Sequence, residues 1–326
     1  MTLANSLYKA VGNSLAPAGQ NASLSILTFH RVLASQDSIF PHEPTVETFE
    51  AQMACLKAVF NVIPLAEAIT HLKNGTLPAR AVCITFDDGY ADNVSLALPV
   101  LKKYGLHATF FIATAYLNGG RMFNDTVIEA IRLCRKDEID LTALGLGVHD
   151  VSNDNAKHDA IAHILPKMKY LPLDQREDTA AKLAEMISDT PLPDDLMMTT
   201  EQLKSLHASG MEIGGHTSHH PILAGLDSAN ARQEIAEGKE YLQDVLGAQI
   251  KLFAYPNGKP GVDYLAEQAE IVSALGFDAA VSTQAGVAHH ASDLFQLPRV
   301  TPWYSSAARY VPAFLYNLYR YRQAAR

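Results

Sequence analysis

The feature of this sequence that most constrains its fold is a regular alternation between short β-prone runs and longer amphipathic segments. Runs rich in β-branched and aromatic residues occur at 23–30, 61–65, 81–88, 108–114, 211–217, 250–256, 279–283 and 295–300. Between them, 47–59 and 228–246 carry apolar residues at helical spacing. Such alternation indicates parallel strands with helices outside them. With about seven or eight strands, we predict a closed or nearly closed α/β barrel rather than an open doubly wound sheet.

One long stretch interrupts this alternation. Residues 116–200 show no clear strand pattern and include "LPLDQRED" and "TPLPDD". We predict that this stretch is a mostly helical insertion. The domain that contains it spans 23–300 and follows an N-terminal segment at 1–22. A connection of this length usually shapes a binding site. The alternative is a helical lid that contributes only packing.

Composition and charge exclude several classes of protein. The 326 residues are 48% hydrophobic and 19% charged, which is typical of a globular domain with a sizeable core. The three cysteines, Cys55, Cys83 and Cys134, follow no disulfide or metal-binding spacing, which favours a reducing compartment. The net charge of −9 argues against general nucleic-acid binding. No uninterrupted apolar run is long enough to predict a transmembrane helix.

The sequences of the two terminal segments allow a prediction of where the protein is located. The first 25 residues lack a continuous apolar run, so we expect no secretory signal, although a trimmed chain would look the same. We therefore expect a cytoplasmic protein, or one peripheral at the inner membrane face. The segment 301–326 is a basic, aromatic, amphipathic tail. Its apolar stripe could contact an anionic membrane or pack against the barrel; it consists of Val311, Phe314, Leu315 and Leu318.

Polar side chains gather where predicted strands end. Asp87 and Asp88 close the run at 81–88, and His216 and His220 follow the run at 211–217, four positions apart. In a parallel barrel the carboxyl ends of the strands meet on one face, where catalysis takes place. Two imidazoles and one carboxylate suit a divalent metal that keeps open positions for water and substrate. The alternative is a polar loop whose histidines make ordinary hydrogen bonds.

The adjacent carboxylates, Asp87 and Asp88, can have different chemical roles. Neighbouring side chains on a strand point to opposite sides, and a turn at Gly89 can bring both into one cavity. One carboxylate can then ligate a cation while the other accepts a proton from the attacking water. A helix N-cap is the competing explanation, and it accounts for only one of the two aspartates.

Two motifs resemble those of a known family. "TFDDG" at 85–89 and "HTSHH" at 216–220 resemble the first two motifs of the NodB-like polysaccharide deacetylases, carbohydrate esterase family 4. The resemblance covers about residues 23–300 and implies a distorted (β/α)7 barrel, here with the insertion and a C-terminal helical tail. It also implies a divalent metal, zinc first, with nickel, cobalt or manganese as alternatives. The implied ligands are Asp88, His216 and His220, and the implied general base is Asp87.

Two later motifs depart from the family pattern. "AYPNG" at 254–258 has Ala254 where an Arg–x–Pro–Tyr-type motif has arginine, and "LPR" at 297–299 lacks the histidine of the late Leu–x–His motif. Instead, "TFHRV" places His30 on the first strand. This resembles the exopolysaccharide poly-N-acetylglucosamine N-deacetylases, in which an early histidine replaces the late one. The resemblance implies that His30 is the general acid, and we expect Arg299 to orient Asp87.

The predicted function follows from these assignments. We expect a metal-dependent hydrolase that removes N-acetyl groups from an N-acetylhexosamine poly- or oligosaccharide in exopolysaccharide or cell-envelope biosynthesis. A backbone N–H near Tyr90 or Tyr255 would hold the oxyanion. Alternatives are deacylation of a lipid-linked amino sugar, O-acetyl esterase activity on a polysaccharide, and a non-catalytic carbohydrate-binding relic. The expected substrate-binding residues are Tyr90, Tyr255, Pro256 and Asn257.

Overall fold

A nine-stranded sheet forms the centre of the molecule in the computed structural model, which describes residues 3–302 and 307–324. Within it, parallel neighbours follow one another around the sheet in the order β1 (Ser23–Phe29), β3 (Ala81–Phe86), β4 (Thr109–Ile112), β7 (Glu212–Gly215), β8 (Leu252–Ala254), β9 (Ala279–Ala285) and β11 (Leu297–Arg299). Two short strands extend it. β2 (Asn61–Val62) pairs with β3, and β10 (Ala288–His289) runs antiparallel to β1.

The sheet nearly closes on itself. Just after β11, Val300 donates a backbone hydrogen bond to Ile26 of β1 at 2.8 Å and accepts one from Thr28 at 3.1 Å. Residues Leu24–Phe29 and Ala81–Phe86 are buried throughout, as expected for strands covered on both faces. The predicted distorted (β/α)7 barrel is therefore confirmed.

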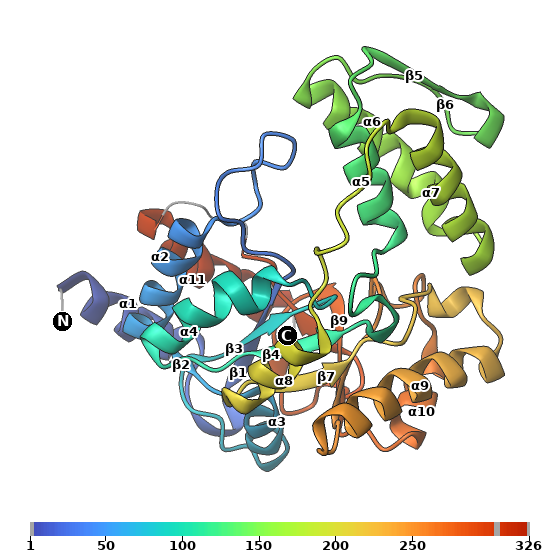
Figure 1. The fold of residues 1–326 in the computed structure, drawn as a ribbon. Helices are drawn as coiled ribbons and strands as arrows, with labels where there is room; N and C mark the ends of the chain where they lie inside the picture. The colour runs from blue at the N-terminus through green and yellow to red at the C-terminus, as the bar shows by residue number, and fades with distance from the viewer. Residues whose placement is uncertain (1–2, 303–306, 325–326) are drawn as a thin grey trace.

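Helices surround the barrel (Figure 1), and their buried apolar side chains pack on it. In α2 the Oγ1 of Thr45 caps the first turn by accepting from the N–H of Thr48, and Phe49, Met53 and Leu56 are buried. The barrel helices are α2 (Val46–Val59), α3 (Leu65–Asn74), α4 (Leu98–Tyr104), α8 (Thr200–Ala208), α9 (Ser228–Leu246) and α10 (Ala266–Ala274). Short helical turns lie at Gly19–Asn21, Asn93–Ala97, Thr114–Tyr116, Thr142–Leu144 and Leu223–Gly225.

The insertion rises from one end of the barrel as a separate layer, green to yellow-green in Figure 1. Its helices are α5 (Phe123–Leu133), α6 (Asp154–Lys169) and α7 (Leu173–Ile187), and they share an apolar core of their own. The sequence showed no strand here, but the structure contains an antiparallel hairpin of β5 (Glu138–Leu141) and β6 (Gly147–Asp150). Its strands have four residues each, and in β5 only Ile139 and Leu141 are buried, so the alternation was too short to recognise.

The first and last helices of the chain lie together on the barrel wall. α11 (Ala307–Ala324) packs against α1 (Leu3–Leu15) and α2. The apolar stripe of the tail is buried, and the ring of Phe314 meets that of Phe60 edge-on at 4.6 Å. The stripe was predicted either to contact an anionic membrane or to pack against the barrel, and in the structure it packs against the barrel. Parts of the predicted tail, 303–306 and 325–326, lie outside the described residues, and none of the described helices is long and apolar enough to cross a membrane.

Candidate metal-dependent active site

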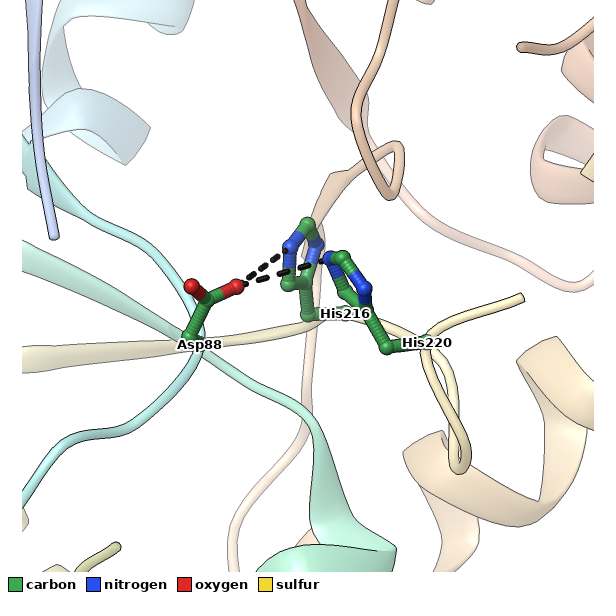
Figure 2. A group of neighbouring side chains, drawn as sticks. All are labelled: Asp88, His216 and His220. Carbon is green, nitrogen blue, oxygen red and sulfur yellow. Dashed lines mark ion pairs between the residues drawn. The ribbon is translucent and has the colours of Figure 1, made fainter. Parts of the chain in front are cut away.

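Asp88, His216 and His220 meet at the carboxyl ends of β3 and β7 (Figure 2). One potential ligand atom from each residue lies within 4.8 Å of the others. Oδ1 of Asp88 is 3.4 Å from Nε2 of His216 and 3.5 Å from Nε2 of His220. The structure thus brings together the three residues that the sequence analysis selected as metal ligands.

The backbone around these residues is unusual. Asp88 has a φ of 77° and His220 a φ of 50°, a left-handed conformation that non-glycine residues seldom adopt. Gly89 follows with a φ of 96°, so the expected turn is present and already begins at Asp88. Such conformations carry a cost of roughly 1–3 kcal/mol and cluster at functional sites.

The hydrogen-bonding pattern of His216 leaves a ring nitrogen available to a metal. Nδ1 lies 2.7 Å from the carbonyl oxygen of Ala254. Because a carbonyl only accepts, Nδ1 must carry the hydrogen, and in the neutral ring the lone pair is then on Nε2, which faces Asp88. This arrangement is typical of metal-ligating histidines.

Burial and charge act differently on the three groups. Burial lowers the pKa of His220 to about 3, so this ring is neutral near pH 7. Burial alone would raise the pKa of Asp88, but the close contact with His216 and the other imidazoles near it hold this pKa well below its usual value. Burial also disfavours the charged form of His216, but the neighbouring Asp88 and Asp87 raise its pKa above the usual value. Metal binding requires the unprotonated ring, and an ionised carboxylate with two unprotonated imidazole nitrogens is a donor set that fits a divalent cation such as zinc.

Asp87 is held by Arg299 through both carboxylate oxygens. The guanidinium donates from Nη1 to Oδ1 at 2.7 Å and from Nη2 to Oδ2 at 2.6 Å. Nε of Arg299 donates to the carbonyl oxygen of Ser282, and both members of the pair are buried. Although burial opposes it, Arg299 lowers the pKa of Asp87. The predicted pairing of Arg299 with Asp87 is present, and it keeps Asp87 ionised.

A cavity of about 740 Å³ contains these groups. Asp87, Asp88, His216 and His220 line it from the barrel, and His30 lines it from the exposed end of β1. The insertion supplies another wall, from which Phe123, Asn124, Asp125, Ile128, Glu129, Arg132, Leu165, Pro166, Lys169 and Tyr170 line the same space. The insertion therefore shapes the site and is not a helical lid that contributes only packing.

The four expected substrate-binding residues separate into two groups. Tyr90 and Asn257 line the cavity. Tyr255 points into the core, where its hydroxyl donates to the carbonyl oxygen of Phe295 at 2.8 Å and its ring stacks on Tyr264. Its backbone N–H donates to Val281, and Pro256 is buried outside the cavity lining. These placements argue against substrate contacts by Tyr255 and Pro256 and against Tyr255 as the oxyanion donor.

Asp125 was missed by the sequence analysis. This aspartate of α5 is 4% exposed, and its Oδ1 accepts a hydrogen bond from the hydroxyl of Tyr90 at 2.9 Å. Within the described part of the chain, its Oδ2 has no hydrogen-bond partner. Burial is the main reason that the pKa of Asp125 is raised to about 7. No motif marks this residue, because it lies inside the insertion.

Arg176, on α7, was also missed. Its side chain is 2% exposed, and its guanidinium lies 3.3–3.4 Å from the backbone carbonyl oxygens of His219 and His220. The guanidinium also covers the ring of Phe123 at 4.4 Å. Arg176 thus joins the insertion to the loop that carries His220.

Comparisons with known proteins show the family of this chain. A family model described as "Polysaccharide deacetylase" matches residues 74–280. A Bacillus subtilis protein, YxkH, is named as a polysaccharide deacetylase on a provisional basis. It is 24% identical to this chain over 281 residues, which cover 86% of this chain and 71% of YxkH. A poly-β-1,6-N-acetyl-D-glucosamine N-deacetylase of Staphylococcus epidermidis is 29% identical over 145 residues, which are 40% of this chain and half of that relative.

Solved structures show the same fold. A deacetylase of Streptococcus pyogenes, PplD, superposes with a TM-score of 0.60 at 20% identity over 91% of this chain and 98% of its own. IcaB from Ammonifex degensii gives 0.58 at 22% identity, over 90% and 97%. Because the family model covers well over half of the chain, this protein belongs to the polysaccharide deacetylase family and is a deacetylase hydrolase.

Proposed function

We propose that this deacetylase removes N-acetyl groups from a neutral N-acetylhexosamine polymer or oligomer in a metal-dependent reaction. The observation that carries the proposal is the convergence of Asp88, His216 and His220 in one cavity with the Asp87–Arg299 pair. The name of the staphylococcal relative, a poly-β-1,6-N-acetyl-D-glucosamine N-deacetylase, supports the choice of substrate class.

Asp88, His216 and His220 would hold the divalent cation, for which zinc is the first choice. A bound cation of this kind supplies Lewis-acid polarisation of the acetamide carbonyl and lowers the pKa of a water. His216 is held for this role by its hydrogen bond to Ala254, and His220 by the contacts of its loop with Arg176.

Asp87 accepts the proton of the attacking water, and Arg299 fixes the direction of its carboxylate. His30, at the mouth of the cavity, donates a proton to the departing nitrogen. A backbone N–H near Tyr90 is the remaining proposed donor to the oxyanion. One water is consumed, and the products are acetate and a free amino sugar.

The charges of the cavity support a neutral glycan over a phosphate-linked one. Each lysine or arginine that lines it already pairs with a carboxylate: Arg31 with Asp92, Arg132 with Asp37, and Lys169 with Asp263. Among the described lining residues, no lysine or arginine is left without an acidic partner. A lipid diphosphate would therefore meet little uncompensated positive charge.

The test compares Asp88→Ala with Asp87→Asn. Asp88→Ala should lose bound metal and acetate release together, because one of three ligands is gone. Asp87→Asn should retain the metal and lose roughly a hundredfold or more in turnover. Metal analysis and acetate release from N-acetylglucosamine oligomers measure both, and exposed Asp278→Asn is the matched control.

Normal turnover by Asp87→Asn would contradict its assignment as the base, and full metal content in Asp88→Ala would contradict the ligand set. His30→Ala should also lose about a hundredfold or more, since general acids typically contribute that much. A loss below about tenfold would remove His30 from its role. Acetate release only from O-acetylated glycans would favour the esterase alternative.

A further inference from the structure

Tyr90 joins the insertion to the segment that carries Asp87 and Asp88. It follows Asp88 by two positions, is 4% exposed and lines the catalytic cavity. Its hydroxyl donates a hydrogen bond of 2.9 Å to Oδ1 of Asp125, in the first turn of α5. Its ring lies in a buried cluster with Met122, the residue before α5. The insertion therefore holds the hydroxyl of this tyrosine at the wall of the cavity.

The backbone on both sides of Tyr90 is also fixed. The carbonyl oxygen of Gly89 accepts a hydrogen bond from the N–H of Met198 at 3.0 Å. The N–H of Ala91 donates to the carbonyl oxygen of Leu196 at 2.8 Å. In a planar trans peptide the N–H points away from the carbonyl oxygen, so the N–H of Tyr90 points away from Met198.

This N–H of Tyr90 is available to a ligand. Within the described residues it makes no hydrogen bond, although the residue is buried and lines the cavity. Backbone N–H groups of buried residues seldom lack a partner, so a group in the cavity is expected to accept from this one. An oxyanion that forms on a carbonyl group two residues from Asp88 would be such an acceptor.

The side chain of Tyr90 is held from the barrel as well. The guanidinium carbon of Arg31 lies 4.8 Å from the centroid of the tyrosine ring. Nε of Arg31 donates to Oδ2 of Asp92 at 2.7 Å, and Oδ1 of Asp92 accepts from the backbone N–H of Val32 at 3.2 Å. Arg31 thus reaches the ring from the barrel while Asp125 reaches the hydroxyl from the insertion. A rotation of the tyrosine would break its hydrogen bond to Asp125.

We propose that Asp125 is a positioning residue for the reaction: by holding the hydroxyl of Tyr90, it fixes the backbone N–H of Tyr90 as the donor to the oxyanion. The proposal rests on the proposed function, in which a backbone N–H near Tyr90 has this role. Removal of one oxyanion donor typically costs about a hundredfold to a thousandfold in kcat. Displacement of a reacting group by roughly 1 Å can cost on the order of a hundredfold. Asp125 would therefore affect turnover without touching the reacting atoms.

The experiment measures acetate release from N-acetylglucosamine oligomers by the zinc-loaded protein. Asp125→Ala removes the acceptor of the Tyr90 hydroxyl and should lower kcat about tenfold or more, with KM and zinc affinity changed by less than about threefold. Tyr90→Phe removes the donor and should lose a similar factor. Asp125→Asn keeps an acceptor, because its carbonyl oxygen can take the same hydrogen bond, and should retain about a third or more of the wild-type kcat.

Two further variants separate positioning from a general loss of structure. Tyr104→Phe is the matched control, since its hydroxyl bonds to Glu50 and it does not line the catalytic cavity, and it should turn over like the wild type. The double variant Tyr90→Phe/Asp125→Ala should lose no more kcat than the more impaired single variant, because the two side chains act through one hydrogen bond. Thermal unfolding of each zinc-loaded variant shows that it is folded in the assay.

The proposal is overturned if Asp125→Ala or Tyr90→Phe keeps kcat within about threefold of the wild type. It is also overturned if the losses of the two single variants multiply in the double variant, or if Asp125→Asn is as impaired as Asp125→Ala. A fall in zinc affinity parallel to the fall in kcat would overturn it too, because the variants would then act on Asp88. Failure of the proposed function is distinct, since the wild type itself would then release no acetate from N-acetylated oligomers.

Discussion

At the scale of single residues, the neighbouring carboxylates Asp87 and Asp88 differ in their partners. Both are buried, which disfavours the charged form, and in both the partners outweigh that effect and lower the pKa. Asp87 is bound at both oxygens by Arg299, whereas Asp88 faces His216 and His220. The partners therefore leave Asp88 open to a cation and fix Asp87 beside it.

Asp125 gives a pH-dependent prediction. Its pKa rises from the ordinary 3.8 to about 7 in the folded protein, so the folded state binds the proton more tightly than the unfolded state. Its contribution to stability is then fully present below pH 4 and is lost as the pH rises toward 7, by up to about 4 kcal/mol. Asp125→Asn cannot ionise, so its stability relative to the wild type should increase between pH 4 and pH 8.

Urea unfolding of the metal-free proteins at several pH values measures this difference. The exposed Asp278→Asn is the control and should follow the wild-type curve. Parallel curves for Asp125→Asn and the wild type would show that Asp125 is ionised in the folded protein throughout this range.

At the scale of elements, helix α9 approaches the metal loop closely because residue 238 is glycine. A Cβ added to Gly238 would lie 2.6 Å from the carbonyl oxygen of Thr217 and 2.7 Å from its carbonyl carbon. Alanine normally favours a helix over glycine by about 1 kcal/mol, but here it would push against backbone. Gly238→Ala should therefore destabilise the protein by about 1–3 kcal/mol and weaken metal binding at His216 and His220.

Thermal unfolding and metal titration check this prediction. Gly225→Ala is the matched control, because a Cβ there meets nothing within 4 Å. Unchanged metal affinity in Gly238→Ala would mean that the loop moves without disturbing its histidines.

The insertion should influence metal affinity through Arg176. Arg176→Met removes the donors to the carbonyl oxygens of His219 and His220 while preserving much of the apolar stem. We expect about a tenfold or greater loss in metal affinity, as for other groups that orient a ligand, and partial recovery in Arg176→Lys. Titration with zinc measures it, with the exposed Lys182→Met on the same helix as control. Equal zinc affinities for Arg176→Met and Lys182→Met would show that Arg176 contributes only to packing.

At the scale of the whole molecule, the barrel was predictable from the sequence because its strands are apolar runs between amphipathic helices. The residues at the ends of β3 and β7 were predictable because parallel strands bring their carboxyl ends together. The insertion was harder, since Asp125 and Arg176 act through contacts between distant segments. Tyr255 was predicted to contact the substrate because its loop resembles a family motif. Its stacking on Tyr264 in the core could not be predicted, since it depends on three-dimensional packing.

The contact of α11 with the segment that follows α2 gives the last prediction. Phe314 of α11 is 4% exposed and packs edge-on against Phe60, which follows α2. Truncation of a buried phenylalanine leaves a cavity and typically costs about 3–5 kcal/mol, so Phe314→Ala should lower the unfolding free energy by that amount. Tyr316, two residues further along α11, is 60% exposed, and Tyr316→Ala should change stability by less than about 0.5 kcal/mol. Chemical unfolding compares the two variants, and a cost below about 1 kcal/mol for Phe314→Ala would show that α11 is not part of the cooperative core.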